Sequence, residues 1–183
     1  FDQRLERYIE VPSLNVPFNQ RPEMSAEKII DTVIRELSRN SFQFSRINLA
    51  NGDMVGHTGD FDATVYAIEV VDTALGKLVD FITKQGGAVL ITADHGNADD
   101  MGEREKKTGT LLRDSFGRII PKTSHSLNPV PFYVVLPPEE LGKYKLRNIE
   151  NPGLGHVAGS IATLLGYQAP GFFLPSLLEK IQT

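Results

Sequence analysis

Residues 88–97 read AVLITADHGN, a continuous apolar run that ends in a short polar segment. Such a run, bounded by turn-forming residues, is typical of a strand that is buried on both faces of a parallel sheet. Gly86 and Gly87 precede the run, and Gly96 and Asn97 end it. We therefore predict a buried strand over 88–92, with Asp94 and His95 just past its carboxyl end, where open α/β sheets bind ligands.

Periodic apolar residues on both sides of this strand predict helices. Over 61–85, apolar residues recur every three or four positions, and the same spacing recurs over 26–39, where Ser25 is a plausible N-cap, and over 154–165. Shorter apolar runs at 44–49 and 131–136 predict two further strands. This order of elements predicts an α/β fold with a mostly parallel sheet that helices cover on both faces.

Two segments lie outside this regular pattern. Residues 1–24 contain Pro12, Pro17 and Pro22 and are expected to form an extended connector. Residues 99–122 are charged and interrupted by glycines, which predicts an excursion from the core with a hairpin turn near Asp114–Gly117. The first residue is not methionine, and the opening segment reads as a strand that leaves a core built elsewhere, so we expect a fragment of a longer protein.

Composition limits the classes of function. The 183 residues suffice for one domain, and a net charge of −4 without a basic stripe gives no reason to expect nucleic acid as a partner. Because the chain has no cysteine, disulfides and thiolate metal sites are excluded. No run of apolar residues is long enough to span a membrane and no targeting segment is evident, so we expect a cytoplasmic protein that does not associate with membranes.

Polar residues in three separate segments suggest a metal site. Asp53 and His57 lie in NGDMVGHTG, which we expect to form a loop that Gly52 and Gly56 allow to fold around an ion. Adding His125 from KTSHSLNP gives two histidines and one carboxylate, the ligand set of a catalytic metal site with open positions. Asp94 and His95 offer a second ligand pair, and two neighbouring ions would clamp the attacking and leaving oxygens of a phosphoryl or sulfuryl transfer.

Each of these residues also has an interpretation that involves no metal. A single histidine after an aspartate is more often a surface or hydrogen-bonded residue than a ligand, and TADHGN alone could be a turn at a strand end. The co-occurrence of three such segments favours the metal site. His156 has no acidic neighbour in GLGHVAG, and we expect a capping or hydrogen-bonded histidine. The acidic residues of the long helix are expected to form its solvated face: Glu69, Asp72 and Asp80.

The longer motifs carry a specific resemblance. NLANGDMVGHTGDFDATVYAIEVVDTALGKLVDFI (48–82), ITADHGNADDM (91–101) and TSHSLNPVPF (123–132) resemble the C-terminal part of cofactor-independent (2,3-bisphosphoglycerate-independent) phosphoglycerate mutases of the alkaline phosphatase superfamily. VPSLNVPFNQRPEMSA (11–26) and HVAGSIATLLGYQAP (156–170) extend the resemblance over nearly the whole chain. It is weakest at 102–122.

The resemblance implies a fold, an activity and ligands. The fold is an alkaline-phosphatase-like α/β/α sandwich in three layers, with residues 1–183 as the C-terminal portion of its phosphatase domain. The activity is an isomerase of glycolysis and gluconeogenesis, which interconverts 3-phosphoglycerate and 2-phosphoglycerate through a phosphoserine and needs no free bisphosphoglycerate. Two divalent metal ions are implied. Manganese is the expected metal, and cobalt, zinc and magnesium are the alternatives. Asp53, His57 and His125 would bind one ion, and Asp94 and His95 the other.

The resemblance also shows what this chain lacks. The family's nucleophilic serine and one further metal-binding aspartate belong to an N-terminal segment that nothing in this chain matches. We expect the N-terminal segment to be the partner of this chain, and the complete enzyme to be a monomer. The chain alone should be inactive. Two alternatives remain at this stage: another phosphomutase or a phosphodiesterase of the same superfamily, and a non-catalytic metal-binding fragment.

Overall fold

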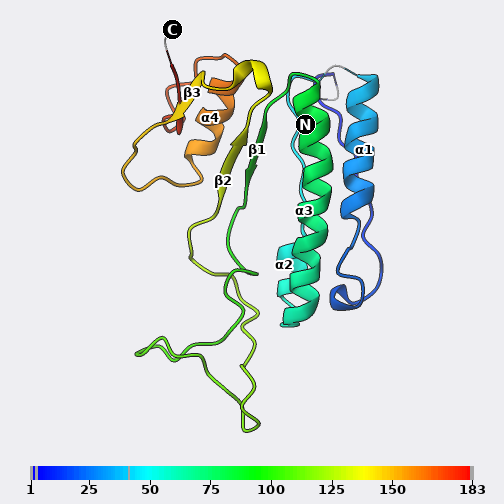
Figure 1. The fold of residues 1–183 in the computed structure, drawn as a ribbon, viewed down its shortest axis with the longest axis vertical. Coiled ribbons are helices and arrows are strands. Elements are labelled where there is room, and N and C mark those ends of the chain that lie inside the picture. The colour runs from blue at the N-terminus through cyan, green and yellow to red at the C-terminus, as the bar shows by residue number, and fades with distance from the viewer. Residues whose placement is uncertain (1, 3, 41, 182–183) are drawn as a thin grey trace. The chain divides into compact units, whose positions relative to one another are not determined.

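The computed structural model describes residues 2, 4–40 and 42–181, which form two compact units (Figure 1). The first unit contains the described residues up to Lys77 together with Gly96–Asn128. The second contains Leu78–His95 and the described residues from Pro129 onward. The long helix α3 (Phe61–Lys84) contributes residues to both units.

Two helices of the first unit agree with the sequence prediction. Helix α1 spans Ala26–Arg39 and buries Ile30 completely, as its apolar spacing requires. Lys77 of α3 forms an ion pair with Asp31 of α1, and the two helices lie side by side (Figure 1). Ser25 occupies the N-cap position of α1, but its side chain does not cap the helix, because its hydroxyl donates to the carbonyl oxygen of Pro12 at 3.2 Å.

The loop predicted around Asp53 is a helix instead. Helix α2 spans Asn51–Gly56 despite its two glycines. Tertiary contacts outweigh the low helix propensity of glycine here: Val55 is fully buried, and the Asn51 amide donates to the carbonyl oxygens of Pro22 and Glu23 at 2.9 and 3.1 Å. The short η1 (Phe18–Gln20) packs against α2.

The prediction of a strand at 44–49 is wrong. These residues adopt no regular secondary structure, and they pair with no other strand among the described residues. Phe44 is 54% exposed, so the apolar run has no packing surface of its own. A run of β-forming residues becomes a strand only when a neighbour supplies the hydrogen bonds of the ladder.

The excursion at 99–122 folds back on itself, as its glycines indicate. Isolated bridges pair Gly102 with Pro121, Arg104 with Leu111 and Arg113 with Ile119. The turn predicted near Asp114–Gly117 is present, since Gly117 has a φ of 80° and its N–H donates to the Asp114 carbonyl oxygen at 3.0 Å. The excursion returns the chain to residues 123–126.

The second unit holds four strands in two antiparallel pairs. Strand β1 (Val89–Thr92) pairs with β2 (Phe132–Val135), and β3 (Tyr144–Leu146) pairs with β4 (Leu178–Lys180). The mixed α/β class is confirmed, but no parallel pair occurs among the described strands, and β1 is half-buried rather than buried on both faces. The short η2 (Pro138–Glu140) follows β2.

Helix α4 (His156–Leu164) packs against β4 and confirms the last predicted helix. His156 is buried at its first turn, and the Nδ1 atom lies 2.8 Å from the Pro175 carbonyl oxygen, so it is a hydrogen-bonded histidine as expected. Glu69, Asp72 and Asp80 lie on the exposed face of α3. Within the described part of the chain, no helix combines the length and the apolar character that crossing a membrane requires.

Candidate metal centre

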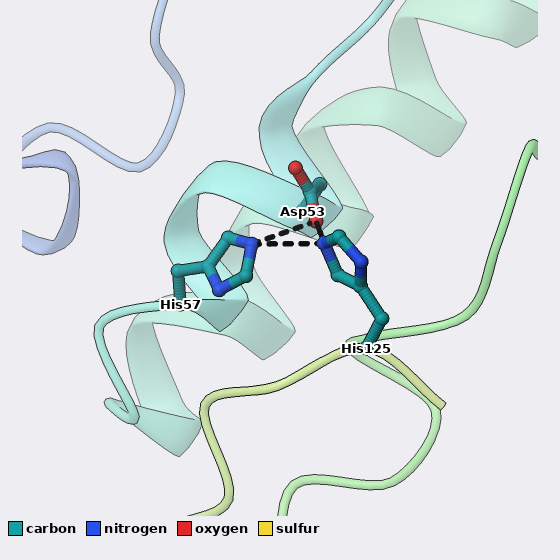
Figure 2. A group of neighbouring side chains, drawn as sticks. All are labelled: Asp53, His57 and His125. Carbon is teal, nitrogen blue, oxygen red and sulfur yellow. Dashed lines mark hydrogen bonds and ion pairs between the residues drawn. The ribbon is translucent and has the colours of Figure 1, made fainter. Parts of the chain in front are cut away.

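Asp53, His57 and His125 converge in the first unit (Figure 2). Asp53 lies in α2 and His57 follows its last residue, so their spacing of four residues places both side chains on one helix face. His125 comes from the segment that returns from the excursion. Asp53 Oδ1 lies 3.2 Å from the Nε2 atoms of both histidines, which are 3.1 Å apart.

These three atoms have the spacing of ligands around one ion. Zinc-like ions bind nitrogen and oxygen at about 2.0 to 2.2 Å. Three ligands at that distance, separated by 3.1 to 3.2 Å, subtend angles of about 100° at the ion, between the octahedral and tetrahedral values. The side chains of Asp53, His57 and His125 are 33%, 39% and 48% exposed, so solvent reaches the centre in this chain.

A backbone carbonyl selects the tautomer of His57. The Nδ1 atom of His57 lies 2.5 Å from the carbonyl oxygen of Thr123, which can only accept a hydrogen bond. Nδ1 therefore carries the proton, and the neutral ring presents the lone pair of Nε2 to the centre. Support of this kind from an oxygen behind the ring is typical of metal-binding histidines.

A buried amide supports Asp53. The Asn97 side-chain amide donates to Asp53 Oδ1 at 3.3 Å, and Asn97 is 5% exposed. The oxygen that receives this bond is the same atom that lies nearest both histidines.

The segment that carries His125 is fixed by the neighbouring Ser126. The Ser126 N–H donates to the Gly96 carbonyl oxygen at 2.8 Å, and its hydroxyl donates to Asp99 Oδ2 at 2.8 Å. The Asn128 amide donates to the same oxygen at 2.6 Å. Burial raises the pKa of Asp99, but the hydrogen bonds from Asn128 and Ser126 outweigh it, so the pKa lies below its usual value. A charged carboxylate thus holds the base of the histidine segment.

A second acid ties the excursion to this segment. Lys122 donates to Asp100 Oδ2 at 2.9 Å, and both side chains are 19% exposed. This hydrogen bond lowers the pKa of Asp100, and Arg104, whose Nε lies 3.3 Å from Oδ1, lowers it further. The pair fixes the chain just before Thr123, whose carbonyl oxygen supports His57.

The sequence matches the model of the Metalloenzyme superfamily over residues 1–169. The chain belongs to this superfamily. A metal centre made of nitrogen and oxygen ligands agrees with that membership.

Named relatives match the chain along nearly its whole length. It is 46% identical over 180 residues to a protein of Leptospira interrogans named "Probable 2,3-bisphosphoglycerate-independent phosphoglycerate mutase", covering 98% of this chain and 32% of the relative. The 2,3-bisphosphoglycerate-independent phosphoglycerate mutase of Trypanosoma brucei brucei is 40% identical over 174 residues, covering 95% of this chain and 31% of the relative.

A solved structure also resembles the chain along nearly its whole length. The chain superposes with a TM-score of 0.92, at 40% identity, on Leishmania mexicana phosphoglycerate mutase studied at low cobalt concentration, covering 98% of this chain and 33% of that one. The expected alkaline-phosphatase-like α/β fold is confirmed. The chain spans about a third of the length of the relatives that it matches.

Asp94 and His95, the other two predicted metal ligands, belong to the second unit. They follow β1 where the strand has ended, as predicted, and His95 Nε2 lies 3.7 Å from Asp94 Oδ1. Their place beside the other three ligands stays a prediction.

Sequence reasoning missed two supporting groups. Asn97 stood in the TADHGN motif but was taken only as a residue that ends the strand. The Thr123 carbonyl oxygen carries no residue-specific signal at all, because every residue has one.

Proposed function

We propose that this chain is the metal-binding C-terminal part of a 2,3-bisphosphoglycerate-independent phosphoglycerate mutase, which interconverts 3-phosphoglycerate and 2-phosphoglycerate. One observation carries the proposal: Asp53, His57 and His125 converge in a chain that aligns almost end to end with named mutases. The reaction belongs to glycolysis and gluconeogenesis, and we place it in the cytoplasm.

The residues of the chain have distinct tasks in this proposal. Asp53 brings the negative charge, and His57 and His125 bring neutral nitrogen donors, a set that suits manganese, cobalt and zinc. We propose manganese as the resident ion, with Asp94 and His95 as ligands of a second one. A divalent cation held here supplies positive charge against the oxygens of a phosphoryl group. The Thr123 carbonyl oxygen and Asn97 keep the donors turned toward the centre.

We propose that the other catalytic residues lie in a part of the enzyme outside residues 1–183. The relatives are about three times as long, and no serine of this chain reads as the nucleophile that forms the phosphoserine. Helix α3 has apolar side chains that are exposed in this chain: Phe61, Val65, Tyr66 and Ile68, at 63%, 43%, 50% and 44%. We propose that the N-terminal part of the same enzyme covers this face, and that the complete protein is a monomer.

The test is conversion of 3-phosphoglycerate with manganese and without added bisphosphoglycerate. The purified chain should show no turnover, because phosphoryl transfer needs a positioned nucleophile as well as charge stabilisation. Adding the N-terminal two thirds of the Leptospira relative, fused or as a separate polypeptide, should restore turnover.

The same fusion carrying Asp53→Ala is the control and should be inactive. Turnover by the chain alone, abolished by replacing one of its own serines, would show that the nucleophile lies within it. A folded, manganese-loaded fusion without turnover would favour the non-catalytic metal-binding alternative.

A further inference from the structure

We propose that Asn97 is a positioning residue of the metal centre, which holds the Asp53 carboxylate so that Oδ1 faces both histidines. The inference rests on the proposed metal site, not on the mutase reaction. Asn97 acts on the centre through Asp53, whose Oδ1 atom accepts the hydrogen bond from its amide.

The hydrogen bond from Asn97 constrains one oxygen of a partly exposed carboxylate. The Asp53 side chain is 33% exposed, whereas Asn97 is 5% exposed and cannot move easily. The Asn97 amide nitrogen lies 3.3 Å from Asp53 Oδ1, the atom that is 3.2 Å from each histidine nitrogen. A fixed donor on one side therefore selects which carboxylate oxygen points into the centre.

The orientation of the amide follows from charge. If the amide were turned over, its oxygen would face the carboxylate oxygen of Asp53, which is repulsive. With the nitrogen toward Asp53, the Asn97 Oδ1 atom is buried and has no hydrogen-bond donor among the described residues. A buried acceptor without a donor costs stability.

Gly56 makes room for this contact at the last turn of α2. A Cβ added at Gly56 would overlap Asn97 Oδ1 and lie 2.9 Å from Asn97 Cγ. Any side chain there would push the amide away from Asp53, even though Asn97 itself remained. Gly56 has no positive φ, so alanine suits its backbone and favours the helix.

This geometry gives two independent variants for one test. Titration calorimetry with Co²⁺ measures the affinity of the 183-residue chain, its Asn97→Ala and Gly56→Ala variants, and the double variant. Each single variant should bind Co²⁺ about 10 to 100 times more weakly, as expected for loss of a group that supports a ligand. The double variant should lose little more, because both changes break the same contact. The visible absorption of bound Co²⁺ should change with the altered coordination.

Gly52→Ala is the matched control in the same helix. Its Cβ would meet only the flexible end of Ile68, at 3.0 Å from Cδ1, and Ala98 Cβ at 3.9 Å, so it should leave Co²⁺ affinity within about twofold. Thermal unfolding without metal separates the two roles. If Asn97 is only structural, Asn97→Ala should lower the melting temperature and leave the affinity for Co²⁺ unchanged. All titrations are made below the melting temperature of each variant.

Unchanged affinity in Gly56→Ala, with a wild-type chain that binds Co²⁺, would overturn the role of Asn97 and leave the metal site standing. A wild-type chain that binds no Co²⁺ would overturn both. If Asn97→Ala does not fold, Gly56→Ala alone decides.

Discussion

His57 and His125 meet through their Nε2 atoms at 3.1 Å, with Asp53 Oδ1 at 3.2 Å from each. The Thr123 carbonyl oxygen accepts a hydrogen bond from Nδ1–H of His57, so the Nε2 lone pair of that tautomer points at two other electron-rich atoms. Such an arrangement requires a proton or a cation between the donors. Protons and metal ions therefore compete for the centre, and metal affinity should fall in acid.

Replacing His125 with alanine removes one nitrogen donor from an exposed segment. We expect His125→Ala to lose the ion bound by Asp53 and His57 and to keep the fold, because His125 is exposed. Elemental analysis after dialysis against manganese measures the loss. Leu127→Ala is the matched control, since Leu127 is fully exposed two residues away. Unchanged manganese content in His125→Ala would contradict the assignment.

At this scale the sequence predicted the residues that carry the chemistry better than those that support them. Asp53, His57 and His125 are recognisable because acidic and imidazole groups cluster in short motifs. Asn97 reaches Asp53 across 44 positions of sequence. Such a contact depends on tertiary packing, which local patterns do not contain.

Among the elements, the long helices were predictable and α2 was not. Apolar residues at helical spacing identified α1 and α3 because each buries one continuous face. In α2 the two glycines indicated a loop, yet the spacing of Asp53 and His57 was itself helical, and burial of Asn51 and Val55 stabilises the helix. The strand predicted at 44–49 failed for the opposite reason, since β propensity without a partner forms no ladder.

The excursion should be sensitive to acid through Asp100. Lys122 lowers the pKa of Asp100 in the folded chain. The charged carboxylate therefore stabilises the fold at pH values above its pKa in the unfolded chain, about 4, and this stabilisation is lost as the pH falls below that value toward the lower pKa of the folded chain. Asp100→Asn should cost about 1 to 2 kcal/mol at pH 7, and it should flatten the decline in acid.

Urea unfolding with a chelator present, between pH 7 and pH 3, measures both effects. Asp72→Asn on the exposed face of α3 is the control and should resemble the wild type. An equally steep decline in Asp100→Asn would show that other groups cause the acid sensitivity.

Across the whole molecule, all three clustered ligands belong to the first unit. Manganese should stabilise that unit by mass action, by about 2.7 kcal/mol at one hundred times the dissociation constant. Hydrogen exchange should slow in α2 and at 123–126, the segments that carry the ligands, while α4 changes little. Equal protection of α4 and α2 would indicate a general effect rather than a local site.

The most direct measurement is anomalous diffraction at the manganese edge from crystals of the chain grown with manganese. The metal-site account predicts a peak about 2.0 to 2.3 Å from Asp53 Oδ1 and from Nε2 of both His57 and His125. A peak elsewhere, or none at these three atoms in a manganese-containing crystal, would contradict it.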